Sequence, residues 1–111
     1  MVDRLFVPLN KEWFDLFRQH RKDWEIRGIS ARFNEKTVRV GRRVELRRGY
    51  QKKGAIWGTI VDYVITENIT DLPEEILIRA IPESRTPEMQ AELDIYNEKY
   101  PSFITFKVML D

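Results

Sequence analysis

Apolar residues recur with two different periods along this chain. A period of two is typical of strands, because successive side chains point to opposite faces of a sheet, whereas spacings of three and four are typical of helices. Alternation predicts strands over residues 5–9, 22–27, 42–48, 55–66 and 102–110, with a brief one at 38–40. Helical spacing predicts helices over 11–20 and 86–98, and the acidic residues at 71–75 indicate another helix start.

The order of these elements predicts the fold class. The first strand carries Pro8, which suits an edge strand. The segment 55–66 is apolar on both faces, which favours a central strand, and Gly58 within it indicates a bulge or a close backbone approach. One strand, a helix, several strands, further helices and a last strand predict an α+β fold with a mainly antiparallel, barrel-like sheet. With 111 residues and no linker or repeat, we expect a single domain over residues 1–111.

Composition excludes several kinds of site. The chain has no cysteine and one histidine, His20, so disulfides, thiol catalysis, cysteine-based zinc sites and histidine-rich metal sites are excluded. We therefore expect no metal and no cofactor. No apolar run approaches the roughly 20 residues of a membrane span, and the first residues do not have the layout of a signal peptide. The expectation is a cytoplasmic protein without a membrane partner, either a monomer or a weak homodimer.

The net charge of +1 conceals an uneven distribution. Residues 1–58 hold 15 Lys and Arg against 7 Asp and Glu, whereas residues 59–111 hold 4 against 11. Clustered cations attract phosphates, so this division favours a surface that faces nucleic acid. The alternative is that both signs interleave in the folded chain.

Three charged residues at the start of the second strand are the candidate site. Glu25 and Arg27 point to the same face, roughly 6.6 Å apart along the strand, and the long stem of Lys22 can bring its ammonium to that face. Such a group offers cations to a phosphate or a carbonyl oxygen and a carboxylate to an amino group on a base edge. The alternative is a surface salt-bridge cluster worth at most about 1 kcal/mol.

The stretch WFDLFRQHRKDWEIR, residues 13–27, resembles the opening of ASCH domains. In that family a helix leads into a strand with a Lys-x-x-Glu-x-Arg pattern, matched here by Lys22, Glu25 and Arg27. The later runs GRRVELRRGY and GAIWGTI look like the following barrel strands of the family, and the resemblance spans roughly residues 13–110. It implies a PUA-like, mainly antiparallel β-barrel with flanking helices and an association with RNA.

The chain departs from this pattern at two positions. Family members usually carry glycine two residues before the lysine, where this chain has His20, so we expect a junction of different shape. Some bacterial members are amidohydrolases that remove the acetyl group from N4-acetylcytidine, and others have been linked to ribonuclease activity. The amidohydrolases resemble this chain at Lys22 and Arg27, but they have a threonine in place of Glu25 and use a later glutamate, for which Glu83 is the nearest candidate. Whether the chain is an enzyme, with Lys22, Glu25 and Arg27 as catalytic residues, stays open.

A basic stretch with aromatic residues follows the motif. It suits a strand and loop that track phosphates and stack bases, and the alternative is an edge strand protected by charge. Arg32, on the loop after the motif, is placed to overhang the site, and the alternative is that this loop is mobile and solvated. The candidate residues for binding nucleic acid, besides the motif, are Arg32, Arg47, Arg48, Tyr50, Lys52, Lys53 and Trp57.

Three functions follow from these features. The leading hypothesis is a module that binds RNA or a modified nucleoside in a polar pocket formed by the motif. The second is a small hydrolase that acts on an acylated nucleoside or on RNA. The third is a protein-interaction module whose site is vestigial. In each case the acidic helix over 86–98 is expected to be a solvated cover of the core.

Overall fold

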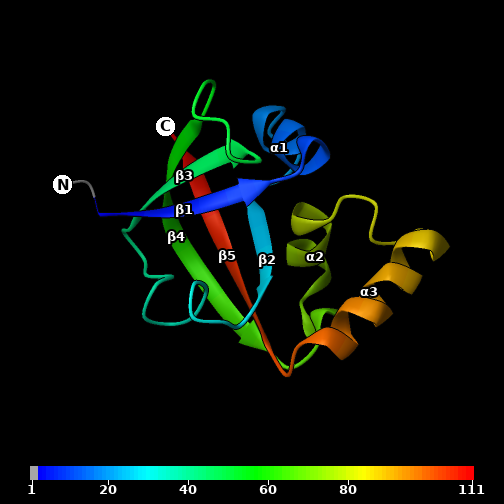
Figure 1. Cartoon of the computed structure of the whole chain (residues 1–111). Coiled ribbons are helices and arrows are strands. Elements are labelled where there is room, and N and C mark those ends of the chain that lie inside the picture. Colours follow the sequence, from blue (N-terminus) through cyan, green and yellow to red (C-terminus); the bar gives the residue numbers. More distant parts are fainter. Residues whose placement is uncertain (1–2) are drawn as a thin grey trace.

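The computed structural model describes residues 3–111 and contains five strands, three α-helices and one short 3-10 helix among them (Figure 1). In chain order they are β1 (Arg4–Leu9), α1 (Lys11–Arg18), β2 (Trp24–Gly28), β3 (Arg43–Arg48), β4 (Ile56–Thr66), η1 (Ile69–Asp71), α2 (Glu74–Ala80), α3 (Pro87–Lys99) and β5 (Phe103–Leu110). Figure 1 shows α2 and α3 beyond β2, on the opposite side of the molecule from the beginning of β1.

The strands form one sheet in the order β1-β3-β4-β5-β2. β1 pairs with β3 in parallel, and the three other pairings are antiparallel. The α+β class, the mainly antiparallel sheet, the edge position of the first strand and the central position of β4 are therefore confirmed. The expected barrel takes the form of a half-barrel, in which β1 and β2 are the two edges.

Two clusters of buried apolar residues join the sheet to the helices that pack against it. The first lies on the concave side and combines β-strand residues with Phe14 and Phe17 of α1. The second lies between the sheet and the segment containing η1, α2 and α3, with Trp24 and Phe103 at its centre. Because β5 contributes to both clusters, it is buried on both faces over most of its length.

The brief strand predicted at 38–40 is wrong. Residues 29–42 are irregular and lie across the open side of the half-barrel, where Phe33 stacks on Phe106 of β5 with ring centroids 6.3 Å apart. Val38 is fully buried as part of a turn in which its amide donates to the carbonyl of Asn34, whereas Val40 is 63% exposed. Residues two positions apart would share one face of a strand, but these two valines differ in burial. None of the described strands pairs with this segment, so the spacing of the valines alone does not produce a strand.

The helix before the α1–β2 junction is shorter than the sequence predicts. Asn10 caps α1 by accepting a hydrogen bond from the amide of Trp13, but the helix ends at Arg18 rather than at residue 20. His20 adopts a φ of 59°, which lies in the left-handed region that glycine favours. The histidine therefore takes the backbone conformation that a glycine would supply, and the expected change of shape is not seen at this residue.

Gly58 marks a close backbone approach, as its place in β4 predicts. A Cβ atom at this position would lie 2.6 Å from the carbonyl oxygen of Met109 on β5. The irregularity in the β4–β5 pairing lies further along, between Ile60 and Asp62. The helix start expected at 71–75 is α2, which begins at Glu74 after η1.

Candidate functional site: a buried ion cluster under a pocket

Lys22 lies between α1 and β2, and its side chain is only 2% exposed. Its Nζ atom donates to the backbone carbonyls of Trp24 at 2.7 Å and Ala80 at 2.5 Å, and it lies 3.1 Å from Oε1 of Glu25. Two aromatic rings of α1 also lie 5.2 and 5.3 Å from this atom. Ala80 is the last residue of α2, so the ammonium ties the negative end of that helix to β2.

Glu25 stands between two cations. Its Oε2 atom accepts a hydrogen bond from Nε of Arg27 at 2.8 Å and lies 2.7 Å from Nη2, while Oε1 faces Lys22. Burial raises the pKa of Glu25, but the charges of Lys22 and Arg27 outweigh this effect and hold the pKa below its ordinary value of 4.5. Burial lowers the pKa of Lys22 from 10.5, and the carboxylate of Glu25 opposes that change. Glu25 is thus an anion that two cations share.

Arg27 is the member of the cluster that meets solvent, with a side chain 23% exposed. Its Nη2 atom donates to the carbonyl of Pro8 at 2.7 Å, and its guanidinium lies 4.7 Å from the ring centroid of Phe33. Pro8 belongs to β1 and Arg27 to β2, so this hydrogen bond spans the gap between the two edge strands. Its Nη1 atom makes none of these contacts and remains able to donate.

The geometry limits the chemistry of each residue. Glu25 and Arg27 share a face as predicted, but the alternative of a surface salt-bridge cluster is wrong, because Lys22 and Glu25 are 3% and 6% exposed. The ammonium of Lys22 has three acceptors for its three N–H groups, so all of its donors are engaged within the protein. Lys22 therefore fixes Glu25, and Glu25 in turn fixes the guanidinium that a ligand would meet.

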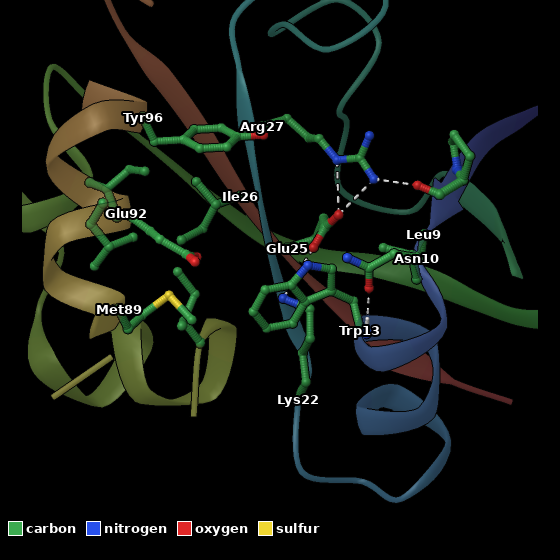
Figure 2. A pocket seen from close by; sticks show the side chains of 14 residues that line it. Leu9, Asn10, Trp13, Lys22, Glu25, Ile26, Arg27, Met89, Glu92 and Tyr96 are labelled. Carbon is green, nitrogen blue, oxygen red and sulfur yellow. Dashed lines mark hydrogen bonds and ion pairs between the residues drawn. The ribbon is translucent and has the colours of Figure 1, made fainter. Parts of the chain in front are cut away.

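A pocket with a cavity volume of about 340 Å³ lies over this cluster (Figure 2). It opens between the β1–α1 junction on one side and α3 on the other, and Figure 2 shows the side chains of Trp13, Tyr96 and Glu92 around it. Apolar residues make up much of the remaining wall, namely Leu9, Ile26, Ile69, Ile81, Met89 and Leu93. An aromatic and aliphatic lining with a few polar groups is typical of small-molecule sites.

The sequence did not predict the α3 wall of this pocket. α3 is not only a solvated cover, because it contributes Met89, Glu92, Leu93 and Tyr96 to the lining. The carboxylate that α3 adds to the pocket is therefore Glu92, whereas Glu83 is exposed and lies in a neighbouring depression. The helical spacing of residues 89, 92, 93 and 96 was the available signal, since these positions share one face.

Asn10 is a second pocket residue that the sequence marked only as a helix cap. Its Oδ1 atom is engaged by the amide of Trp13, which leaves its Nδ2 amide to donate towards the cavity edge. The pocket thus combines two donors, on Asn10 and Arg27, with one acidic acceptor on Glu92.

The other candidate residues lie outside the pocket, on or beside the convex face of the sheet. Arg32 does not overhang the cavity; its guanidinium lies 5.8 Å from the ring of Phe6. Arg47 pairs with Glu45, and Trp57 is half-buried beneath the guanidinium of Arg43. Side chains at the β3–β4 turn are exposed, namely Arg48, Tyr50, Lys52 and Lys53. The structure therefore separates the candidates into a pocket group and a sheet-face group.

Within residues 3–111, no group of three or more His, Cys, Asp or Glu side chains is arranged to hold a metal ion. In that same range, none of the helices has both the length and the apolar character needed to cross a membrane.

Comparisons with known proteins place the fold. No protein-family model matches the sequence, and no curated protein is detectably similar to it in sequence. Among solved structures, hypothetical protein PH0355 matches with a TM-score of 0.72 at 11% identity, over 97% of this chain and 99% of that one. Protein PF0455 from Pyrococcus furiosus matches with a TM-score of 0.63 at 15% identity, over 96% of both chains.

A third solved structure carries the family name. ASCH from Zymomonas mobilis matches with a TM-score of 0.66 at 14% identity, over 96% of this chain and 67% of that one. At this identity the likeness is one of fold, and it agrees with the resemblance of the motif region in the sequence. The chain therefore has the PUA-like half-barrel fold of ASCH domains.

Proposed function

We propose that the chain is an ASCH-family module that binds RNA or a modified nucleoside, with one base held in the pocket over Lys22, Glu25 and Arg27. The observation that supports it most is the fixed guanidinium of Arg27 at the floor of an aromatic pocket. A guanidinium whose orientation is set before binding does not lose that freedom when a ligand arrives.

The walls suit a flat heterocycle. Trp13 is half-buried, and Tyr96 is 44% exposed on the opposite side, so both rings present surface on which a base can stack. The volume of about 340 Å³ lies at the lower end of the range for small-molecule sites, which fits a base or nucleoside better than a longer ligand.

The polar groups suit a base with both kinds of hydrogen-bonding group. Arg27 and Asn10 offer donors to a carbonyl or ring nitrogen, and Glu92 offers an acceptor to an exocyclic amino group. A purely apolar ligand would leave these groups unpaired, at a cost in binding free energy.

A second candidate, hydrolysis of an acylated nucleoside, is favoured by one observation. Glu92 enters the pocket from α3 and forms no ion pair with another residue of 3–111, so its carboxylate is free to act as a general base. Lys22 supports this candidate less than the sequence implied, because its three N–H groups are already engaged.

The test is a titration of the protein with cytidine, uridine and N4-acetylcytidine, followed by amide and indole NMR signals. We expect shifts at the indole of Trp13 and the amides around Arg27 and Tyr96. Tyr96→Ala should weaken binding by about 5- to 150-fold, the range for loss of one stacking partner. Ile95→Ala is the matched control, because Ile95 is exposed on the same helix outside the pocket and its loss should leave affinity unchanged.

Two results would contradict the proposal: no shifts with any nucleoside at millimolar concentration, or shifts remote from the pocket. The same samples report hydrolysis. Release of cytidine from N4-acetylcytidine that is lost in Glu92→Gln would make the pocket an active site, while binding without turnover would leave the module as a binder.

A further inference from the structure

The convex face of the sheet carries an aromatic ring on β1 and another on β4, on either side of a glutamate of β3. In β1 the side chains of Leu5, Val7 and Leu9 point into the core, so Phe6 points outward. The strand register aligns Phe6 with Glu45 of β3 and Glu45 with Trp57 of β4. Neighbouring strands lie about 4.8 Å apart, so the backbone positions of Phe6 and Trp57 are separated by roughly 10 Å.

Each of these rings is accompanied by an arginine. The guanidinium of Arg47 lies 4.7 Å from the centroid of Phe6, and that of Arg43 lies 5.9 Å from the centroid of Trp57. The ring of Tyr50, which is 75% exposed, lies 5.8 Å from that of Phe6. Bases stack on both aromatic rings and guanidinium planes, so this row offers two kinds of stacking surface.

The carboxylate in the middle of the row holds the arginines in place. Glu45 is 5% exposed; its Oε1 accepts from Nε of Arg4 at 2.7 Å, and its Oε2 accepts from Nε of Arg47 at 2.9 Å. The burial of Glu45 raises its pKa, but the hydrogen bonds from Arg47 and Arg4 outweigh this effect, so the pKa is lowered. Two cations around one anion leave a local positive charge whose geometry is already fixed.

The rest of the face is also positive. Arg43 pairs with Asp111, but Arg32 beside Phe6 forms no ion pair with any carboxylate of residues 3–111. The four arginines that lie beside these rings or pair with Glu45, namely Arg4, Arg32, Arg43 and Arg47, are thus opposed by two carboxylates, Glu45 and Asp111. On the opposite side of the molecule, α3 carries an excess of acidic residues, so phosphates are attracted to one side only.

We infer that this convex face, defined by Phe6, Tyr50, Trp57, Arg32, Arg43 and Arg47, binds single-stranded RNA. Bases stack on the Phe6–Arg47 and Trp57–Arg43 pairs, and the backbone phosphates lie against Arg32. A double helix does not offer its base faces, so the arrangement suits a single strand. The inference goes beyond the pocket, which lies on another part of the molecule, and it does not depend on nucleoside binding there.

The test uses fluorescence anisotropy of a labelled ten-nucleotide uridine RNA at several KCl concentrations. The wild-type protein should bind more weakly as salt rises, because cation–phosphate contacts release counterions. Phe6→Ala should weaken binding by about 5- to 150-fold, and Trp57→Phe, which keeps a stacking ring, should retain more affinity than Trp57→Ala.

Arg32→Glu is the charge test, since Arg32 is an exposed loop residue whose replacement leaves the core intact. It should weaken binding by at least tenfold and reduce the salt dependence. Lys99→Glu changes the net charge equally at the end of α3, and it should keep the wild-type affinity within about twofold.

The outcomes separate the two proposals. RNA binding lost in Phe6→Ala but kept in the pocket variant Tyr96→Ala supports the convex face, whatever the nucleoside titration shows. Equal loss in Arg32→Glu and Lys99→Glu, wild-type binding in Phe6→Ala, or equally tight binding of a poly-glutamate peptide would each overturn it.

Discussion

Removal of either partner of the Lys22–Glu25 ion pair should cost a large fraction of the free energy of unfolding. The change is Lys22→Met, which keeps the length of the buried stem and removes the ammonium. Glu25 would then retain Arg27 as its only cationic partner, and two backbone carbonyls, those of Trp24 and Ala80, would lose their donor. Glu25→Gln is the complementary change, which leaves a buried ammonium without its counter-charge.

The magnitude follows from the geometry. At 3.1 Å and an effective dielectric constant of about 20, the attraction is about 5 kcal/mol, and desolvation of both groups offsets much of it. Removal of one partner of a buried pair costs about 3–5 kcal/mol, because the other charge stays buried alone. A domain of this size has roughly 5–15 kcal/mol of unfolding free energy, so either single variant should lose a substantial part of it.

The assay is urea unfolding followed by circular dichroism, applied to both single variants and to the double variant. The double variant leaves neither charge stranded, so its loss should be smaller than the sum of the single losses by about 1–3 kcal/mol. Losses below 1 kcal/mol in each single variant, or strict additivity in the double variant, would contradict this prediction. They would mean that neither charge depends on the other in the folded protein.

Three further predictions rest on the same structure. Because the pKa of Glu25 is lowered on folding, the stabilisation that its charge provides is fully present above pH 4.5 and is lost as pH falls through the folded-state pKa. Urea unfolding should therefore show that the difference in unfolding free energy between wild type and Glu25→Gln becomes smaller below pH 4.5. A difference that stays constant with pH would contradict this. Gly58→Ala would place its Cβ 2.6 Å from the backbone carbonyl oxygen of Met109 and should cost about 3 kcal/mol; an unchanged melting temperature in thermal unfolding would be inconsistent with this close approach. Arg27→Lys keeps the charge but loses the fork that engages Glu25, so calorimetric titration should show nucleoside binding weakened by about tenfold, and unchanged affinity would remove Arg27 from the pocket chemistry.

Local patterns in the sequence predicted the elements that pack in regular ways. Thr86 and Pro87 marked the start of α3, and the alternation of Ile104, Phe106 and Val108 marked the inward face of β5. These signals depend on residues a few positions apart. The parallel pairing of β1 with β3 has no such signal, because it joins segments separated by nearly forty residues.

The dependence on residues far apart in the sequence also explains which features of the site could not be predicted. The spacing of Glu25 and Arg27 predicted their shared face, but the burial of Lys22 depends on the carbonyl of Ala80, 58 positions away. The pocket wall formed by α3 also depends on how that helix returns to β2. The chemical character of the side chains could be predicted from local sequence. The burial of Lys22 and the walls of the pocket could not, because they depend on the tertiary arrangement.

The hydrogen bond from Arg27 to the carbonyl of Pro8 also affects self-association. Unpaired strand edges invite another chain to add a strand, and this sheet has two such edges, at β1 and β2. Pro8 has no amide hydrogen to offer, and its carbonyl is occupied by the guanidinium, so this stretch of β1 cannot template a foreign strand. A substitution of Arg27 would expose an aggregation-prone edge as well as alter the pocket, so resistance to aggregation and the ligand recognition proposed above would constrain the same residue.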